Sequence, residues 1–228
     1  LLFWGNAEAR KKKGKKVEEV QTESAYRKFF KGKACETAKG MITLHKMDGR
    51  VYFEIPLALM GREMLMGSTI SEITNNGFGS VGEKPKGLLY ISFVRCDSVI
   101  SLKQLTAQYD TNEENLKQRI KESTIPATIK NFKITTYNED STAVVIDMTD
   151  YLVSADEAID PFSPWAPILA GGERVMEKEF RRENSQVVSI KAFEDNVSVK
   201  SSLTYGLSLK NKVMYIFQRE PFTAVMTR

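Results

Sequence analysis

The stretch MITLHKMDGRVYFEIP at residues 41–56 constrains the fold more than any other part of the chain. Apolar and polar residues alternate on both sides of Asp48-Gly49, which is typical of half-buried strands. An Asp-Gly pair readily takes positive φ at both positions of a type I′ turn, the turn that joins two neighbouring antiparallel strands. We therefore expect a β-hairpin here.

His45 lies in this hairpin and is the only histidine of the chain. Ile42 and Leu44 share one face of the first strand, so His45 should point to the opposite face. A histidine-based metal site usually needs a second imidazole, and nothing near His45 resembles a nucleophile elbow. We expect His45 to be a surface or partner-packing residue and not a ligand.

Alternating runs separated by turn residues predict most of the remaining fold. Hairpins are expected over 88–105 and 131–148, and the last third of the chain again has the pattern of strands. This spacing favours a mainly β fold with a few short helices (α+β), built as an antiparallel, hairpin-rich curled sheet or sandwich.

Two segments have helical patterns. Residues 22–32 place Tyr26, Phe29 and Phe30 on one face, with Thr22 as the expected N-cap, and these aromatics should dock on the body. Residues 110–123 begin with a capping box formed by Thr111 and Glu114. The segment 150–172 is expected to be an irregular loop with one helical turn.

The N-terminal residues divide into two parts. Residues 1–9 end in Ala7-Glu8-Ala9 and resemble the tail of a secretory signal peptide, the alternative being a frayed apolar end. Residues 10–21 form a lysine-rich leader, expected to be disordered, which is a solvated tether or a contact for an anionic surface. The predicted domains are a small one at 22–72 and a β-rich one at 73–228, truncated at its C-terminus.

Composition limits the possible partners. Six of the 33 basic residues lie at 10–16, and without this segment the chain is close to neutral. Nucleic-acid binding would require a basic face on the folded part, so we expect none. No stretch is long and apolar enough to span a bilayer. Cys35 and Cys96 could form one bridge or remain free thiols.

Three groups of residues are weak candidates for a site. Four carboxylates, Asp147, Asp150, Asp156 and Asp160, could hold calcium, although their spacing fits no EF-hand and solvated loop positions are the alternative. Phe78 lies in the glycine-rich segment 74–87, which lacks the context of a phosphate-binding loop. Trp165, between two prolines, is a candidate binding aromatic or an anchor packed on the sheet. No catalytic residue is predicted.

The chain also resembles a known family in several motifs. KGMITLHKMDGRVYFEIPLALMGREMLMGSTIS at 39–71 is similar to the start of secreted bacterial zinc-dependent metalloproteases with a metzincin-like catalytic domain, and the segments LKQRIKESTIPATIKNFKI, VVIDMTDYLVSAD and IKAFEDNVSVKSSLTY are similar to a second uncharacterised domain of that family. The matching motif positions are Lys39, Gly40, Tyr52, Phe53, Glu54, Ile55, Pro56, Gly61, Arg62, Glu63 and Leu65.

This resemblance implies a role for the chain. It would be the non-catalytic N-terminal region of an exported metallopeptidase, packing against its own C-terminal protease domain or positioning a peptide substrate for it. Zinc would bind in that further domain, since this sequence contains no His-Glu-x-x-His motif and should have no activity alone. The alternative is a self-sufficient exported β-rich binding module for a glycan or a protein.

Overall fold

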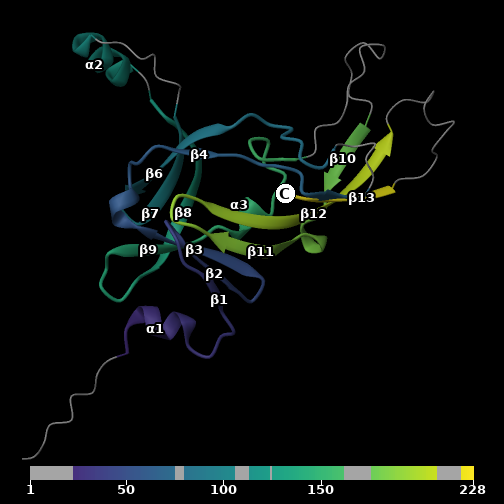
Figure 1. The fold of residues 1–228 in the computed structure, drawn as a ribbon, viewed down its shortest axis with the longest axis horizontal. Coiled ribbons are helices and arrows are strands. Elements are labelled where there is room, and N and C mark those ends of the chain that lie inside the picture. Colours follow the sequence, from purple (N-terminus) through teal and green to yellow (C-terminus); the bar gives the residue numbers. More distant parts are fainter. Residues whose placement is uncertain (1–22, 75–79, 106–112, 124, 162–175, 210–221) are drawn as a thin grey trace, which may run out of the picture.

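The computed structural model describes residues 23–74, 80–105, 113–123, 125–161, 176–209 and 222–228 (Figure 1). Within these ranges the chain is mainly β, with antiparallel strands in a curled sheet and three short α-helices. The fold class expected from the alternating sequence pattern is therefore confirmed.

The larger sheet has eight strands in the order β1-β2-β3-β9-β8-β7-β6-β4. The predicted hairpins at 41–56, 88–105 and 131–148 form three of its pairs, β2–β3, β6–β7 and β8–β9. At the first turn Asp48 and Gly49 have φ of 53° and 73°, as a type I′ turn requires. The strands are β1 (Glu36–Ala38), β2 (Thr43–Met47), β3 (Arg50–Pro56), β4 (Met64–Met66), β6 (Leu89–Cys96), β7 (Val99–Gln104), β8 (Ala127–Tyr137) and β9 (Ala143–Asp147).

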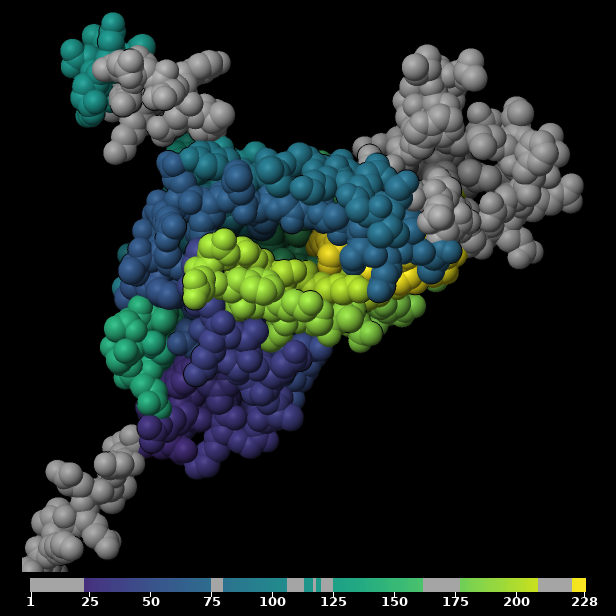
Figure 2. All heavy atoms as spheres, viewed as in Figure 1, coloured from purple at the N-terminus to yellow at the C-terminus, as the bar shows by residue number. Residues whose placement is uncertain are grey.

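The second sheet is organised around one long strand, β12 (Val197–Leu209). Two strands pair along one edge of β12, with β10 (Met176–Phe180) beside residues 205–209 and β11 (Gln186–Ala192) beside residues 197–202. The other edge pairs with β13 (Phe222–Thr227), which in turn pairs with β5 (Glu72–Ile73). Figure 2 shows the yellow-green strands of this sheet between the purple N-terminal part and the blue residues that follow it.

One hydrophobic core joins the two sheets. Alternate residues of the β2–β3 hairpin face this core, and residues of β12 and β13 complete it from the other side. Burial of such side chains stabilises the fold by roughly 1.5–3 kcal/mol each. Members from the two sheets include Leu44, Val51, Phe53, Ile55, Ile100, Ile146, Leu203, Tyr205, Ala224 and Met226.

The boundary expected between residues 72 and 73 is crossed by strand pairing at three places. β3 pairs with β9, β4 with β6, and β5 with β13. In the first two pairs the first strand belongs to the N-terminal segment and the second to the C-terminal one, whereas β5 itself spans the expected boundary. The two segments therefore share their sheets through backbone hydrogen bonds.

The helices are short. α1 (Ala25–Phe30) begins two residues later than an N-cap at Thr22 would place it, because the side chain of Ser24 accepts from the backbone N–H of Arg27; Thr22 lies outside the described residues. α2 (Glu114–Ser123) confirms the helix expected at 110–123, and α3 (Thr149–Leu152) is the helical turn expected near residue 150. Two 3₁₀ turns are η1 (Leu57–Leu59) and η4 (Arg182–Asn184).

None of the helices in the described ranges is both long and apolar enough to span a membrane.

Candidate functional site

His45 lies on the outer face of the β2–β3 hairpin, the face opposite the core. Leu44 next to it is fully buried in the core, so the predicted direction of His45 is confirmed. Of the two positions that we expected, on the surface or packed against a partner, the surface position is wrong, because His45 is only 5% exposed. Helix α1 lies against this face, and the ring of Phe30 is 4.7 Å from the imidazole.

Aromatic side chains hold α1 on the sheet. The rings of Phe29 and Tyr52 meet edge to face at 5.1 Å, and Tyr26 packs on Phe30 at 4.8 Å. Together with Met47 and the neighbouring strand β9 they form a second, smaller hydrophobic cluster. The predicted docking of the α1 aromatics on the body is therefore confirmed.

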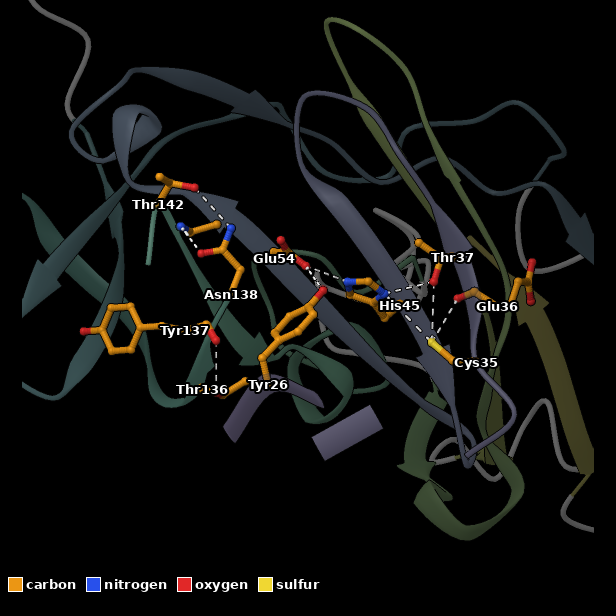
Figure 3. A network of polar contacts seen from close by, with 11 residues as sticks. Tyr26, Cys35, Glu36, Thr37, His45, Glu54, Thr136, Tyr137, Asn138 and Thr142 are labelled. Carbon is orange, nitrogen blue, oxygen red and sulfur yellow. Dashed lines mark hydrogen bonds and ion pairs between the residues drawn. The ribbon is translucent and has the colours of Figure 1, made fainter. Parts of the chain in front are cut away.

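Both ring nitrogens of His45 have polar partners beside this hydrophobic cluster (Figure 3). Nε2 lies 2.9 Å from Glu54 Oε2, and Nδ1 lies 3.0 Å from Thr37 Oγ1. The antiparallel register explains both contacts, because Thr37 is directly opposite His45 and Glu54 is two residues from its other cross-strand partner, Tyr52.

Glu54 determines which atoms of this network carry the hydrogens. Its Oε2 also accepts from the Tyr26 hydroxyl at 2.7 Å. The hydrogen bond from His45 lowers the pKa of Glu54 more than burial raises it, so this carboxyl is ionised at neutral pH. A carboxylate only accepts, which assigns the hydrogen of neutral His45 to Nε2 and leaves Nδ1 as an acceptor.

Tyr26 is affected in the opposite direction. Burial is the main reason why the pKa of its hydroxyl is raised, and the hydrogen bond to Glu54 raises it further. Tyr26 therefore remains a neutral donor at physiological pH. The arrangement is a half-buried carboxylate with two donors, and directed hydrogen bonds compensate its charge.

Cys35 completes the group on the Nδ1 side of His45. Its Sγ lies 3.9 Å from Nδ1, 3.5 Å from Thr37 Oγ1 and 3.7 Å from the carbonyl oxygen of Glu36. The order cysteine, histidine, glutamate is that of a nucleophile, a base and an orienting acid. Both Cys35 and Cys96 are free thiols.

A shallow, open pocket of about 560 Å³ borders this cysteine. It lies between the start of β1 and the β2–β3 turn. Its lining combines a thiol, two acidic side chains, one lysine and apolar surface, from Ala34, Cys35, Glu36, Lys46, Met47, Asp48 and Gly49. The thiol is thus in a place that a small molecule can enter from solvent.

The four aspartates proposed for calcium do not converge. Asp147 binds Arg50 at 2.6 Å, and exposed Asp150 lies 3.2 Å from Arg182. Asp156 accepts from the backbone N–H of Ala158, two residues further on. In the part of the chain that the structure describes, no three His, Cys, Asp or Glu side chains are arranged to hold a metal ion.

Asp160 instead belongs to a buried polar group at the second sheet. It is 1% exposed, accepts from the Tyr205 hydroxyl at 2.7 Å and forms an ion pair with Lys178. Arg228 lies nearby and donates to the carbonyl oxygens of Leu152 and Ile159. Burial lowers the pKa of this guanidinium. The group ties the 149–160 segment to the second sheet.

The candidate binding aromatics, Phe78 and Trp165, lie outside the described residues, as do residues 1–21. The motif residues that carry the family resemblance occupy structural positions. Phe53 is in the core and Pro56 pairs with Ala143. Gly61 has φ of 78°, a region that favours glycine.

Gly40 and Arg62 complete the motif. A Cβ on Gly40 would lie 2.3 Å from the carbonyl oxygen of Phe193, so only glycine permits this close approach. The backbone N–H of Arg62 donates to Leu59 and closes the turn that follows β3. Both residues therefore shape the backbone around the hairpin.

Exposed apolar side chains gather at β4, the edge strand of the larger sheet. Leu65 is 67% exposed and Leu88 is 56% exposed. The Leu88 side chain lies close to Gly67, the residue that follows β4. An apolar patch on an edge strand is typical of a surface that another protein segment covers.

Comparison with protein families gives two matches. A model described as "Domain of unknown function (DUF5117)" matches residues 83–228, and one described as "Domain of unknown function (DUF5118)" matches residues 23–73. No curated protein and no solved structure matches the chain.

Proposed function

The chain belongs to the family described as a domain of unknown function, DUF5117, and from this premise we propose that it is the non-catalytic N-terminal region of an exported zinc-dependent metallopeptidase. In this proposal the two matched segments act as one body. That body packs against a C-terminal protease domain, which supplies the zinc and the chemistry, or positions a peptide substrate for it.

The observation that carries the proposal is the position of β3 in the larger sheet. This strand holds Tyr52, Phe53, Glu54 and Pro56, the motif residues on which the resemblance to the metallopeptidases rests. It lies between β2 and β9 and so joins the two matched segments. Residues that build an interior strand of a shared sheet support a scaffold role, since Phe53 packs in the core and Pro56 pairs with Ala143.

The β4 edge supports the expected packing against a further domain. Leu65 and Leu88 expose apolar surface there, whereas most large apolar residues of both sheets are buried. Covering such a patch removes apolar area from water and stabilises a contact between domains. We place the docking surface at this edge.

The main test compares this chain with the polypeptide encoded by its complete reading frame. Peptidase activity and stoichiometric zinc are expected only in the longer polypeptide. A reading frame that ends at Arg228, or a longer polypeptide with neither zinc nor activity, would reject the proposal and favour an exported module that binds a glycan or a protein.

A second test addresses the docking surface. Leu65→Asp in the complete polypeptide should speed proteolytic separation of the two parts, because a charge on the edge opposes burial. The same change in the isolated chain should leave its unfolding free energy within about 0.5 kcal/mol. Ile125→Asp is the matched control, since Ile125 is 88% exposed and precedes β8, which β7 and β6 separate from β4. Equal effects of both variants would reject docking at β4.

A further inference from the structure

We propose that Cys35 is a reactive thiol site for low-molecular-weight disulfides, with His45 as its base and Glu54 as the residue that orients the base. Three separate strands or strand ends supply these groups. The inference concerns the open pocket beside β1 and is independent of the accessory role proposed above.

The geometry gives the thiol proton a path. Glu54 holds the hydrogen of neutral His45 on Nε2, and Nδ1 is therefore the basic nitrogen that faces Cys35. Thr37 Oγ1 lies 3.5 Å from Sγ and 3.0 Å from Nδ1, so its hydroxyl can relay the proton over a shorter route than the direct 3.9 Å. Contacts of this kind are commonly loose before a reactant binds.

Because His45 is buried, few groups other than the Cys35 thiol can exchange a proton with it. His45 is 5% exposed and Phe30 covers one side of its ring, so solvent hardly reaches it. Cys35 is half-buried and borders the pocket of about 560 Å³. A small disulfide can approach Cys35 from this pocket, whose lining also includes Glu36 and Lys46.

The reaction is a thiol–disulfide exchange. The Cys35 proton passes to His45 Nδ1, and the thiolate attacks one sulfur of the small disulfide. The bond between the two sulfurs of the reagent breaks as the bond to Cys35 Sγ forms. The leaving thiolate takes the proton back from His45, so the products are a mixed disulfide at Cys35 and one free small thiol.

Cys96 provides an internal control. It is exposed, and among its described contacts its Sγ accepts only from the Ser101 hydroxyl at 3.5 Å. Cys96→Ser leaves Cys35 as the single thiol, and Cys35→Ser leaves Cys96. The measurement is the second-order rate with 2,2′-dithiodipyridine at pH 7, followed by release of thiopyridone.

Cys35 should react about tenfold faster than Cys96, although it is less exposed, because an ordinary thiol is only a few per cent thiolate at pH 7. In 6 M guanidinium chloride the two rates should become equal, which would assign the difference to the fold. A Cys35 that reacts no faster than Cys96 in the native protein would overturn the proposal.

Two variants on the Cys96→Ser background test whether His45 acts as a base or only packs beside Cys35. His45→Gln should lower the Cys35 rate about tenfold. Thr37→Val keeps the side-chain shape at an exposed strand position and should lower the rate severalfold by removing the relay. Unchanged circular dichroism is required of each variant. A folded Thr37→Val protein and a folded His45→Gln protein that both keep the original rate would also overturn the proposal.

Discussion

On the inner face of the β2–β3 hairpin, Leu44, Phe53 and Ile55 pack into the core shared with the second sheet, whereas on the outer face His45 and Glu54 are covered by α1. The inner face is mainly apolar, apart from Lys46, which donates to the carbonyl oxygen of Val188, and it is stabilised by burial of apolar area and by close packing. The outer face combines aromatic packing with directed hydrogen bonds, and a buried polar group is costly whenever one of its partners is lost. A change that removes side-chain volume should therefore destabilise the protein most on the inner face. A change that removes a hydrogen-bond partner should destabilise it most on the outer face.

The largest effect is expected from Phe53→Ala on the inner face. The change leaves a cavity in the core and should lower the unfolding free energy by about 3–5 kcal/mol, measured by urea denaturation. Phe193→Ala is the control of the same residue type, because Phe193 is 50% exposed. A similar loss in both variants would contradict the assignment of Phe53 to the core.

Glu54→Ala should have the next largest effect. It removes the acceptor of two buried donors, His45 Nε2–H and the Tyr26 hydroxyl, and should cost about 2–3 kcal/mol in the same measurement. Both bonds use one carboxylate oxygen, so Glu54→Gln can keep an acceptor there and should lose less. An equal loss in the two variants would show that this network does not stabilise the fold.

The pH dependence of stability sharpens the same point. The pKa of Glu54 is lowered in the folded protein from its ordinary 4.5, chiefly by the hydrogen bond from His45. The carboxylate therefore contributes stability above pH 4.5, and this contribution is lost as the pH falls through the lower folded value. Urea denaturation between pH 7 and pH 3 should show a larger decrease for the wild-type protein than for Glu54→Gln. Parallel curves for the two proteins would refute this linkage.

Tyr26→Phe removes one hydroxyl from the outer face and keeps the ring. The unfolding free energy should fall by about 1 kcal/mol, since His45 still satisfies Glu54. In a double-mutant cycle with Glu54→Gln, the two changes should not be additive, because the side chains are in contact. Additive losses of unfolding free energy would show that the Tyr26 hydroxyl stabilises the docking of α1 independently of Glu54.

The smallest effect is expected at the solvent side of α1. Arg27 and Glu139 form an ion pair there, but their side chains are 64% and 48% exposed. Arg27→Ala should leave the unfolding free energy almost unchanged, because solvent screens this pair. A loss as large as that of Tyr26→Phe would mean that the exposed pair, and not the buried network, holds the helix.

Strand hairpins were the part of the fold that the sequence predicted best. Asp48-Gly49 and the alternating residues around it act within a few positions of one another, so their preference is visible locally. β1 was missed because it has only three residues, Glu36–Ala38, too few to show alternation. Its position beside β2 is nevertheless what brings Thr37 opposite His45.

The candidate site was harder to predict for the same reason. Tyr26 meets Glu54 across 28 residues, and Cys35 meets His45 across ten, so neither contact follows a helix or strand period. The aspartates close in sequence suggested a calcium site, but in the folded chain Asp147 forms an ion pair with Arg50 and Asp160 forms one with Lys178. Nearness along the chain was misleading there, because Asp147 ends β9, Asp150 lies in α3 and the other two aspartates follow in the segment after α3.

The sequence by itself determined the antiparallel hairpins and the apolar side of each, because alternation and turn residues express local backbone preferences. Only the tertiary structure decided that the outer face of β2–β3 is also buried, since this depends on where α1 docks. The burial of His45 and its alignment between Glu54 and Cys35 follow from that docking, a balance of aromatic packing and hydrogen bonds that no single segment contains.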